Sequence, residues 1–165
     1  SDDLRQRTIG VYYTACVHAK SDIPGEIVAP TTSEYGFFRT TDPDHWAFAD
    51  TGLLQGDEFG RADSIVGVEC DGGDIEFVAG QPRFTGRDGI SPHYKIIALA
   101  DAVDHGLNKA LGIHHDRYYC TIAVNESEHE GTVFTAATIE WAHGLYRDDS
   151  PVSQITRNVL NRLGV

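Results

Sequence analysis

Apolar and β-branched residues gather in short runs along the first two thirds of the chain, and polar turn residues separate these runs. Short runs bounded by Gly, Pro, Asp and Ser are typical of β-strands. Several of the runs are almost continuously apolar, as in strands that are buried on both faces. The predicted strands are residues 8–17, 35–41, 64–70, 74–78, 94–100, 118–124 and 131–137.

Two segments have helical spacing instead. Residues 101–111 place apolar side chains along one face, and Gly112 follows as a stop signal. Near the C-terminus, Ser150 is suited to cap a helix, Pro151 to its first position and Gly164 to its end. The apolar face of this second helix consists of Val152, Ile155, Val159 and Leu163. We expect the C-terminal helix to pack on the sheet, which gives a strand-rich α/β or α+β fold.

The length of 165 residues predicts a single domain that spans residues 1–165. One central helix and one C-terminal helix cannot cover both faces of a sheet of about six strands. We therefore expect a second protein chain to cover the remaining apolar surface.

The net charge of −12 argues against binding to nucleic acids or to anionic membranes, because both would repel the chain. No apolar run is long enough to span a bilayer, and no secretory signal opens the sequence. Cys16, Cys70 and Cys120 lie far apart in apolar runs, without a CxxC pair, and read as small buried residues. These features predict a protein of the reducing cytoplasm.

Most of the polar clusters indicate loops. The histidines of the segment His114–His115–Asp116 are adjacent, so on a strand they would point to opposite faces and could not share a metal. Residues 125–131 place three acids around His129 between two predicted strands, which is typical of an exposed hairpin loop. The sequence contains no nucleophile elbow, no P-loop and no dinucleotide-binding glycine motif.

Three glutamates remain as candidates for chemistry. Glu69 ends a predicted apolar strand, where it either faces a ligand crevice or lies at a sheet edge. Glu140 and Trp141 follow a predicted strand and could line a pocket, or Trp141 and His143 are core and cap residues. Glu34 begins the predicted strand 35–41, where it either forms an ion pair with Arg39 or acts in a site.

Four stretches together resemble one known family. They are SEYGFFRTTDPDHWAFADTGLLQGDEFG, IVGVECDGGDIEFVAGQPRFTGRDGISPHYKIIALADA, GTVFTAATIEWAHGL and PVSQITRNVLNRL. They resemble the C-terminal region of the large (beta) subunit of N,N-dimethylformamidase, from about residue 31 to residue 165. Residues 1–30 match less clearly and read as a strand-containing N-terminal extension.

The resemblance implies a glutamine-amidotransferase-like layer with a β-rich insertion, and an iron held by two tyrosines and one glutamate. The segment Ser33–Arg39 matches the family's glutamate motif, so Glu34 would be the metal ligand. Glu69, in the Val-Gly-x-Glu motif, would be the catalytic acid that transfers protons. The family's tyrosine ligands lie well upstream of the glutamate, whereas only 33 residues precede Glu34 here. The iron site would then be shared with another chain.

These observations lead to two hypotheses. The first is a subunit or C-terminal part of an iron-dependent hydrolase or hydratase that acts on a C–N bond of a small amide-like substrate. The chain would then be half of a split enzyme or the product of a cut. The second is a non-catalytic structural or binding subunit, such as a descendant that lost the metal, which supports a catalytic partner chain.

Overall fold

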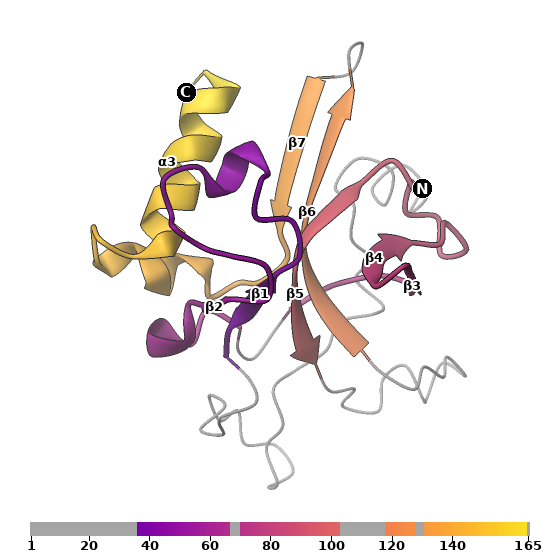
Figure 1. Ribbon diagram of the computed structural model, residues 1–165, viewed down its shortest axis with the longest axis horizontal. Coiled ribbons are helices and arrows are strands. Elements are labelled where there is room, and N and C mark those ends of the chain that lie inside the picture. The colour runs from indigo at the N-terminus through magenta and orange to yellow at the C-terminus, as the bar shows by residue number, and fades with distance from the viewer. Residues whose placement is uncertain (1–35, 67–69, 103–117, 128–130, 165) are drawn as a thin grey trace, which may run out of the picture.

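The computed structural model describes residues 36–66, 70–102, 118–127 and 131–164. Within these residues, the centre of the fold is a five-stranded sheet in the order β2-β1-β5-β6-β7, and all neighbouring strands are antiparallel (Figure 1). The strands are β1 (Phe38–Thr40), β2 (Glu58–Phe59), β5 (Lys95–Ala102), β6 (Tyr118–Ser127) and β7 (Gly131–Ala136). The long central strands β5 and β6 form the middle of the molecule.

A second, two-stranded sheet is a hairpin of β3 (Ile75–Val78) and β4 (Gln81–Phe84). Ala79 and Gly80 connect the two strands, and their φ angles of 52° and 81° are both in the left-handed region. Two consecutive left-handed residues are the signature of a tight hairpin turn that follows the natural twist of the strands. In the described part of the chain, the helical elements are η2 (Trp46–Phe48), η3 (Arg61–Asp63), η4 (Trp141–Tyr146) and α3 (Pro151–Leu163).

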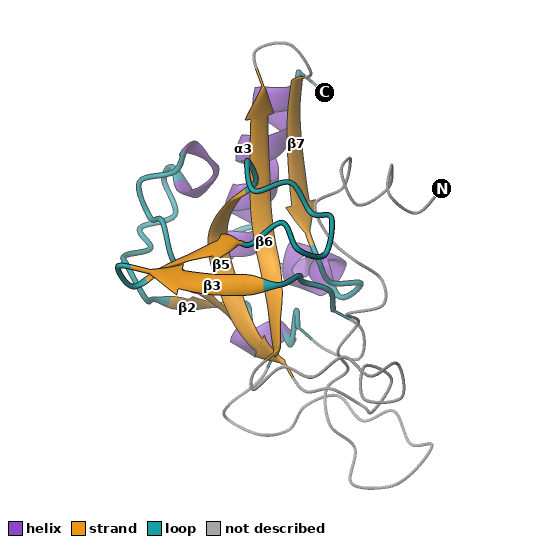
Figure 2. Ribbon diagram, turned by 90° about the vertical axis from the view of Figure 1, so that its right-hand side faces the viewer, coloured by secondary structure: helices purple, strands orange, loops and turns teal. Residues whose placement is uncertain are grey.

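Side chains of β5 and β6 alternate between the two faces of the sheet and divide the core into two clusters. The main cluster includes Ile97 and Ala100 from β5 together with Cys120 and Ile122 from β6. The second cluster includes Ile96, Leu99 and Ala123, whose side chains point to the opposite face of the sheet. Figure 2 shows α3 and β3 on opposite sides of these two strands. The almost continuous apolar sequence of β5 is therefore explained by burial on both faces, as predicted.

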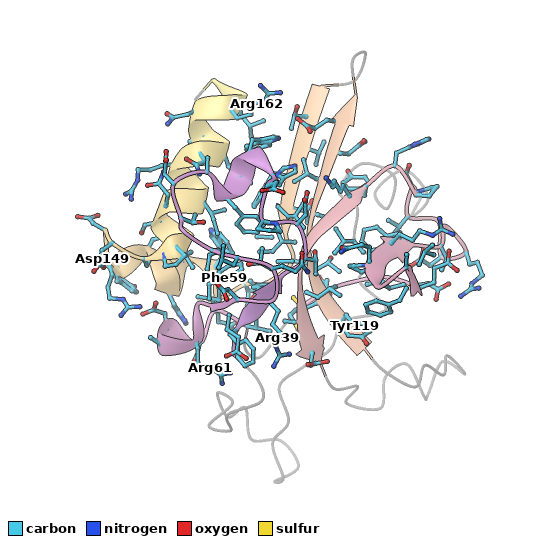
Figure 3. The ribbon with its side chains drawn as sticks, in the orientation of Figure 1. Arg39, Phe59, Arg61, Tyr119, Asp149 and Arg162 are labelled. Atoms are coloured by element: carbon cyan, nitrogen blue, oxygen red, sulfur yellow. The ribbon has the colours of Figure 1, made fainter. Side chains whose placement is uncertain are left out.

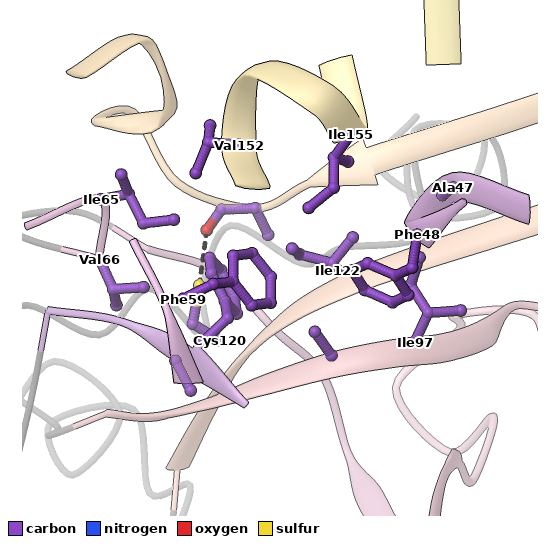
Figure 4. Close-up of a cluster of buried hydrophobic side chains, with 14 of the residues drawn as sticks. Ala47, Phe48, Phe59, Ile65, Val66, Ile97, Cys120, Ile122, Val152 and Ile155 are labelled. Atoms are coloured by element: carbon purple, nitrogen blue, oxygen red, sulfur yellow. Dashed lines mark hydrogen bonds between the residues drawn. The ribbon is translucent and has the colours of Figure 1, made fainter. Parts of the chain in front are cut away.

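Helix α3 covers the main cluster and confirms the prediction for the C-terminal helix. The Ser150 hydroxyl accepts a hydrogen bond from the Ser153 amide, and the helix ends at Gly164 in the left-handed conformation. Val152, Ile155 and Val159 are buried against the sheet, beside Phe48 and Phe59 (Figure 4).

The β3–β4 hairpin and the loop after it cover the second face. Phe84, Ile90 and Tyr94 are buried there and pack on Ile96 and Leu99 of β5. Over β5 and β6, covering this face therefore does not require a partner chain, contrary to the expectation from the number of helices. The β3–β4 hairpin covers this face, whereas the expectation had considered only helices as cover.

Several predicted strands are confirmed, but residues 64–66 of the predicted strand 64–70 are not in a strand. The helix η3 ends at Asp63, and its C-cap Ser64 has a left-handed φ of 48°. Ile65 and Val66 are buried in the main cluster without strand pairing. Cys70 forms only an isolated bridge with Thr138. Burial of an apolar loop produced the same sequence pattern as burial of a strand.

Asp101 and Ala102 belong to β5, so the predicted helix 101–111 does not begin at residue 101, and residues 103–111 lie outside the described part. The predicted strand 8–17 also lies outside it. The sheets are antiparallel wherever they are described, and the glutamine-amidotransferase-like layering is not confirmed. No helix among the described residues is long and apolar enough to cross a membrane.

Candidate functional site

A groove opens where β1, β5 and β6 meet the tip of the β3–β4 hairpin. Its volume is about 340 Å³, which is within the usual range of small-ligand sites. The groove is lined by Arg39, Thr40, Thr41, Gln55, Gly56, Phe77, Leu99, Asp101 and Tyr119. Figure 3 shows Arg39 and Tyr119 at the same end of the central strands, whereas Arg162 lies at the other end. We refer to this feature as the Arg39 groove.

Arg39 forms the polar side of the groove. Its Nη1 donates to Asp101 Oδ2 at 2.9 Å, and its Nη2 donates to Glu58 Oε1 at 3.2 Å. The antiparallel register explains this arrangement, because Arg39 pairs with Glu58 of β2 on one side and with Leu99 of β5 on the other. Arg39 therefore has two carboxylate partners that the sequence did not suggest, and its predicted pairing with Glu34 remains untested.

The neighbourhood of Arg39 is an extended network of charges. Arg61 also contacts Glu58, and the hydrogen bond from Arg61, together with the charges of Arg61 and Arg39, lowers the pKa of the Glu58 carboxyl. The guanidinium groups of Arg39 and Arg61 lie 4.7 Å and 3.6 Å from the ring centroid of the buried Phe37. The carboxylates thus balance both cations, and a free anion would gain little there.

Aromatic and aliphatic side chains form the opposite side of the groove. The rings of Phe77 and Tyr119 meet edge to face, with their centroids 5.7 Å apart. Phe77 is 51% exposed even though it is a large apolar residue. Leu99, which is nearly buried, lies between the polar and the aromatic sides in the sheet.

Glu34 and Glu69, the two acids predicted to act in chemistry, lie outside the described residues. Phe38, Val66 and Cys70, which lie near these two acids in the sequence, belong to the main cluster.

Cys70 and Cys120 are free, buried thiols, as predicted, and Cys16 lies outside the described part. Burial raises the pKa of Cys120 well above its usual value, and the neighbouring Cys70 adds to the effect. The Cys120 thiol also donates to the Ala137 carbonyl at 2.9 Å (Figure 4). A buried, protonated thiol of this kind is not a nucleophile.

A second polar cluster lies at the opposite end of the sheet. Trp46 Nε1 donates to Glu126 at 3.0 Å, and Arg162 donates to the same oxygen at 3.3 Å. This network joins η2, β6 and α3. Glu126 therefore has a structural role, although the sequence indicated only an exposed hairpin charge. The antiparallel pairing of β6 with β7 confirms the hairpin itself, and His129 lies outside the described residues.

His45 is buried beside this cluster. Its Nδ1 accepts a hydrogen bond from the Ala47 amide at 3.2 Å, so the neutral ring carries its proton on Nε2. Nε2 is buried and has no hydrogen-bond partner among the described residues. Burial lowers the pKa of His45, although the charges of Asp42 and Glu126 oppose this shift. Because Nδ1 caps η2, a structural role explains His45.

Trp141, Glu140 and His143 were also candidates from the sequence, and all three lie in the described part of the chain. Trp141 donates to Thr156 Oγ1 at 3.0 Å and packs on the main cluster, which confirms its interpretation as a core residue. Glu140 accepts a hydrogen bond from Thr138 at 3.2 Å, and His143 is exposed in η4. Residues 114–116 lie outside the described part. Within residues 36–66, 70–102, 118–127 and 131–164, no group of three His, Cys, Asp or Glu side chains could hold a metal ion.

Comparison with known protein families identifies the family of this chain. A model of the N,N-dimethylformamidase beta subunit-like, C-terminal family matches residues 3–154. The chain belongs to this family. The match confirms the resemblance seen in the sequence, and it also takes in most of the N-terminal residues in which the resemblance was less clear. No curated protein matches the chain.

Among the described residues, the Arg39 groove is the site that sequence reasoning missed. Arg39 and Asp101 are 62 positions apart, and Phe77 comes from a different sheet. One signal was present in the dimethylformamidase-like motif itself, because Arg39 ends the segment Ser33–Arg39. The partners of this arginine became evident only from the register of β1 with β2 and β5.

Proposed function

We propose that this chain is a subunit or C-terminal part of an iron-dependent hydrolase that acts on a C–N bond of a small amide-like substrate. The observation that carries the proposal is the family match over residues 3–154. The name of that family describes a beta subunit, which supports a second protein chain as partner. In this proposal, Glu34 is a metal ligand and Glu69 is the catalytic acid and base.

The chemistry of the donors supports iron. A carboxylate is a hard oxygen ligand of the kind that ferric iron prefers, and Glu34 supplies one. The described residues contain no group of three His, Cys, Asp or Glu side chains that could hold a metal ion. In this proposal, the two tyrosine ligands that the family resemblance implies come from the partner chain.

When bound, iron would act as a Lewis acid that polarises the amide carbonyl and lowers the pKa of water. Glu69 would accept a proton from the attacking water and deliver it to the nitrogen that leaves. A C–O bond forms as the C–N bond breaks, so that amide and water give a carboxylic acid and an amine.

Two variants separate the two roles in the complex purified with its partner chain. Glu34→Gln is expected to lose iron and turnover together while the chain stays folded. Glu69→Gln is expected to keep its iron and to lose at least about 100-fold in turnover, as for the loss of a general acid–base group. Iron is measured by elemental analysis, folding by circular dichroism, and turnover as the release of dimethylamine from N,N-dimethylformamide.

The matched control is Glu76→Gln, which changes an exposed glutamate of β3 that forms an ion pair with Arg83 across the hairpin. This variant is expected to keep both iron and turnover. A Glu34→Gln complex with full iron and full turnover would contradict the proposal. A wild-type complex without iron or amide turnover would favour the alternative, a non-catalytic subunit that supports its partner.

A further inference from the structure

We infer that the Arg39 groove binds a small uncharged ligand that carries a carboxamide at one end and an aromatic ring at the other. The inference goes beyond the proposed hydrolysis, because it requires neither iron nor Glu34 nor Glu69. It rests on the shape of the groove, its charge balance and the hydrogen-bonding groups that face it.

Among the contacts that the described residues make, the polar side of the groove has hydrogen-bonding capacity to spare. Arginine carries five N–H donors, and the described contacts of Arg39 engage one hydrogen on each of its two terminal nitrogens. The Gln55 side chain donates through Nε2 to the Thr40 carbonyl at 3.4 Å, and no described residue donates to its Oε1. The groove thus offers donors from Arg39 and an acceptor from Gln55. A carboxamide has the complementary pair, a carbonyl oxygen and an N–H group.

The charges near the groove favour an uncharged ligand. The carboxylates of Asp101 and Glu58 already balance Arg39, and Arg61 also pairs with Glu58. The net charge of −12 repels anions further. A carboxylate ligand would bring a further negative charge beside Asp101 and Glu58, whereas an amide carbonyl accepts the same N–H without adding a charge.

The aromatic side of the groove selects the other end of the ligand. Phe77 presents about half of its surface to solvent, and its ring meets the ring of Tyr119. A third ring that enters the groove would extend this pair and bury apolar surface that now faces water. The volume of about 340 Å³ suffices for a single-ring compound.

Three probes of nearly the same shape test the inference, namely benzamide, benzoate and benzamidinium, which are neutral, anionic and cationic. Each is titrated into the full ¹⁵N-labelled chain at neutral pH, and amide chemical shifts are followed. Benzamide is expected to shift the amides of Gly56, Phe77 and Tyr119 in a saturable way, and to leave Arg162 at the other end of the sheet unchanged. Benzoate and benzamidinium are expected to bind more weakly than benzamide.

The variant Phe77→Ala is expected to weaken benzamide binding by about threefold to tenfold, the loss typical of one aromatic contact. Its matched control is Val78→Ala, because Val78 is also exposed but points to the opposite face of β3. This control is expected to bind benzamide like the wild type.

Tighter binding of benzoate or benzamidinium, an absence of saturable shifts with benzamide, or equal affinities of the Phe77→Ala and wild-type chains would each overturn the inference. None of these results bears on iron content or on the Glu34 variant, so failure here is distinguishable from failure of the proposed hydrolysis.

Discussion

At the scale of single residues, the clearest effect of packing on chemistry is at His45. Its lowered pKa means that the folded chain keeps the ring neutral at pH values where the unfolded chain already binds a proton. Protonation would place a hydrogen on Nδ1 and would remove the acceptor that holds the Ala47 amide. His45, which follows an acidic turn in the sequence, is therefore an uncharged N-cap of η2.

Stability is expected to fall as the pH decreases through about 6.5, the ordinary pKa of histidine, because below it the unfolded state binds the additional proton. The contribution of His45 has a slope of at most about 1.4 kcal/mol per pH unit and ends below the folded-state pKa. His45→Asn keeps a side-chain acceptor for the cap but does not titrate. Between pH 7 and pH 5, the free energy of unfolding measured with urea should therefore decrease less steeply for the variant than for the wild type. Equal slopes for the two proteins would refute this role of His45.

Arg39 shows what can and cannot be predicted for a residue. The sequence offered an ion pair between Glu34 and Arg39, and Glu34 lies outside the described residues. In the structure, Asp101 and Glu58 hold its guanidinium, and both are brought there by strand register. Contacts between distant positions depend on the sheet order, which short-range patterns do not contain.

At the scale of elements, the apolar runs were the best predictors of long strands that have a neighbouring strand on each side. The core strands β5 and β6 and the helix α3 were predicted because their pattern and their caps agree. The short edge strand β2 and the strand β4 were missed. β4 reads Gln-Pro-Arg-Phe, and proline argues against a strand except in a small or edge ribbon such as this hairpin.

The turn of the β3–β4 hairpin contains a position at which the sequence is not optimal. Ala79 has a φ of 52°, a conformation that is costly for alanine but well suited to asparagine before glycine. Ala79→Asn is expected to raise the free energy of unfolding by roughly 0.5–1 kcal/mol. Urea denaturation measures the change, and Ala62→Asn at an exposed position of η3 is the control. A destabilised Ala79→Asn chain would be inconsistent with the described turn.

At the scale of the whole molecule, two layers cover the central sheet, with α3 on one side and the β3–β4 hairpin on the other (Figures 1 and 2). The prediction of a partner chain therefore no longer rests on an uncovered face over β5 and β6. It rests on the dimethylformamidase beta subunit-like family, whose name describes a subunit. The ligand proposed for the Arg39 groove and the proposed iron site are independent hypotheses about the molecule.

Native mass spectrometry of the protein purified from its own source distinguishes the shared-site hydrolase from a non-catalytic subunit. We expect a complex that contains this chain, a second protein chain and bound iron, and that loses the iron when Glu34 is replaced by glutamine. A metal-free monomer or homo-oligomer would contradict the shared-site hydrolase and would leave a binding or structural subunit on this fold.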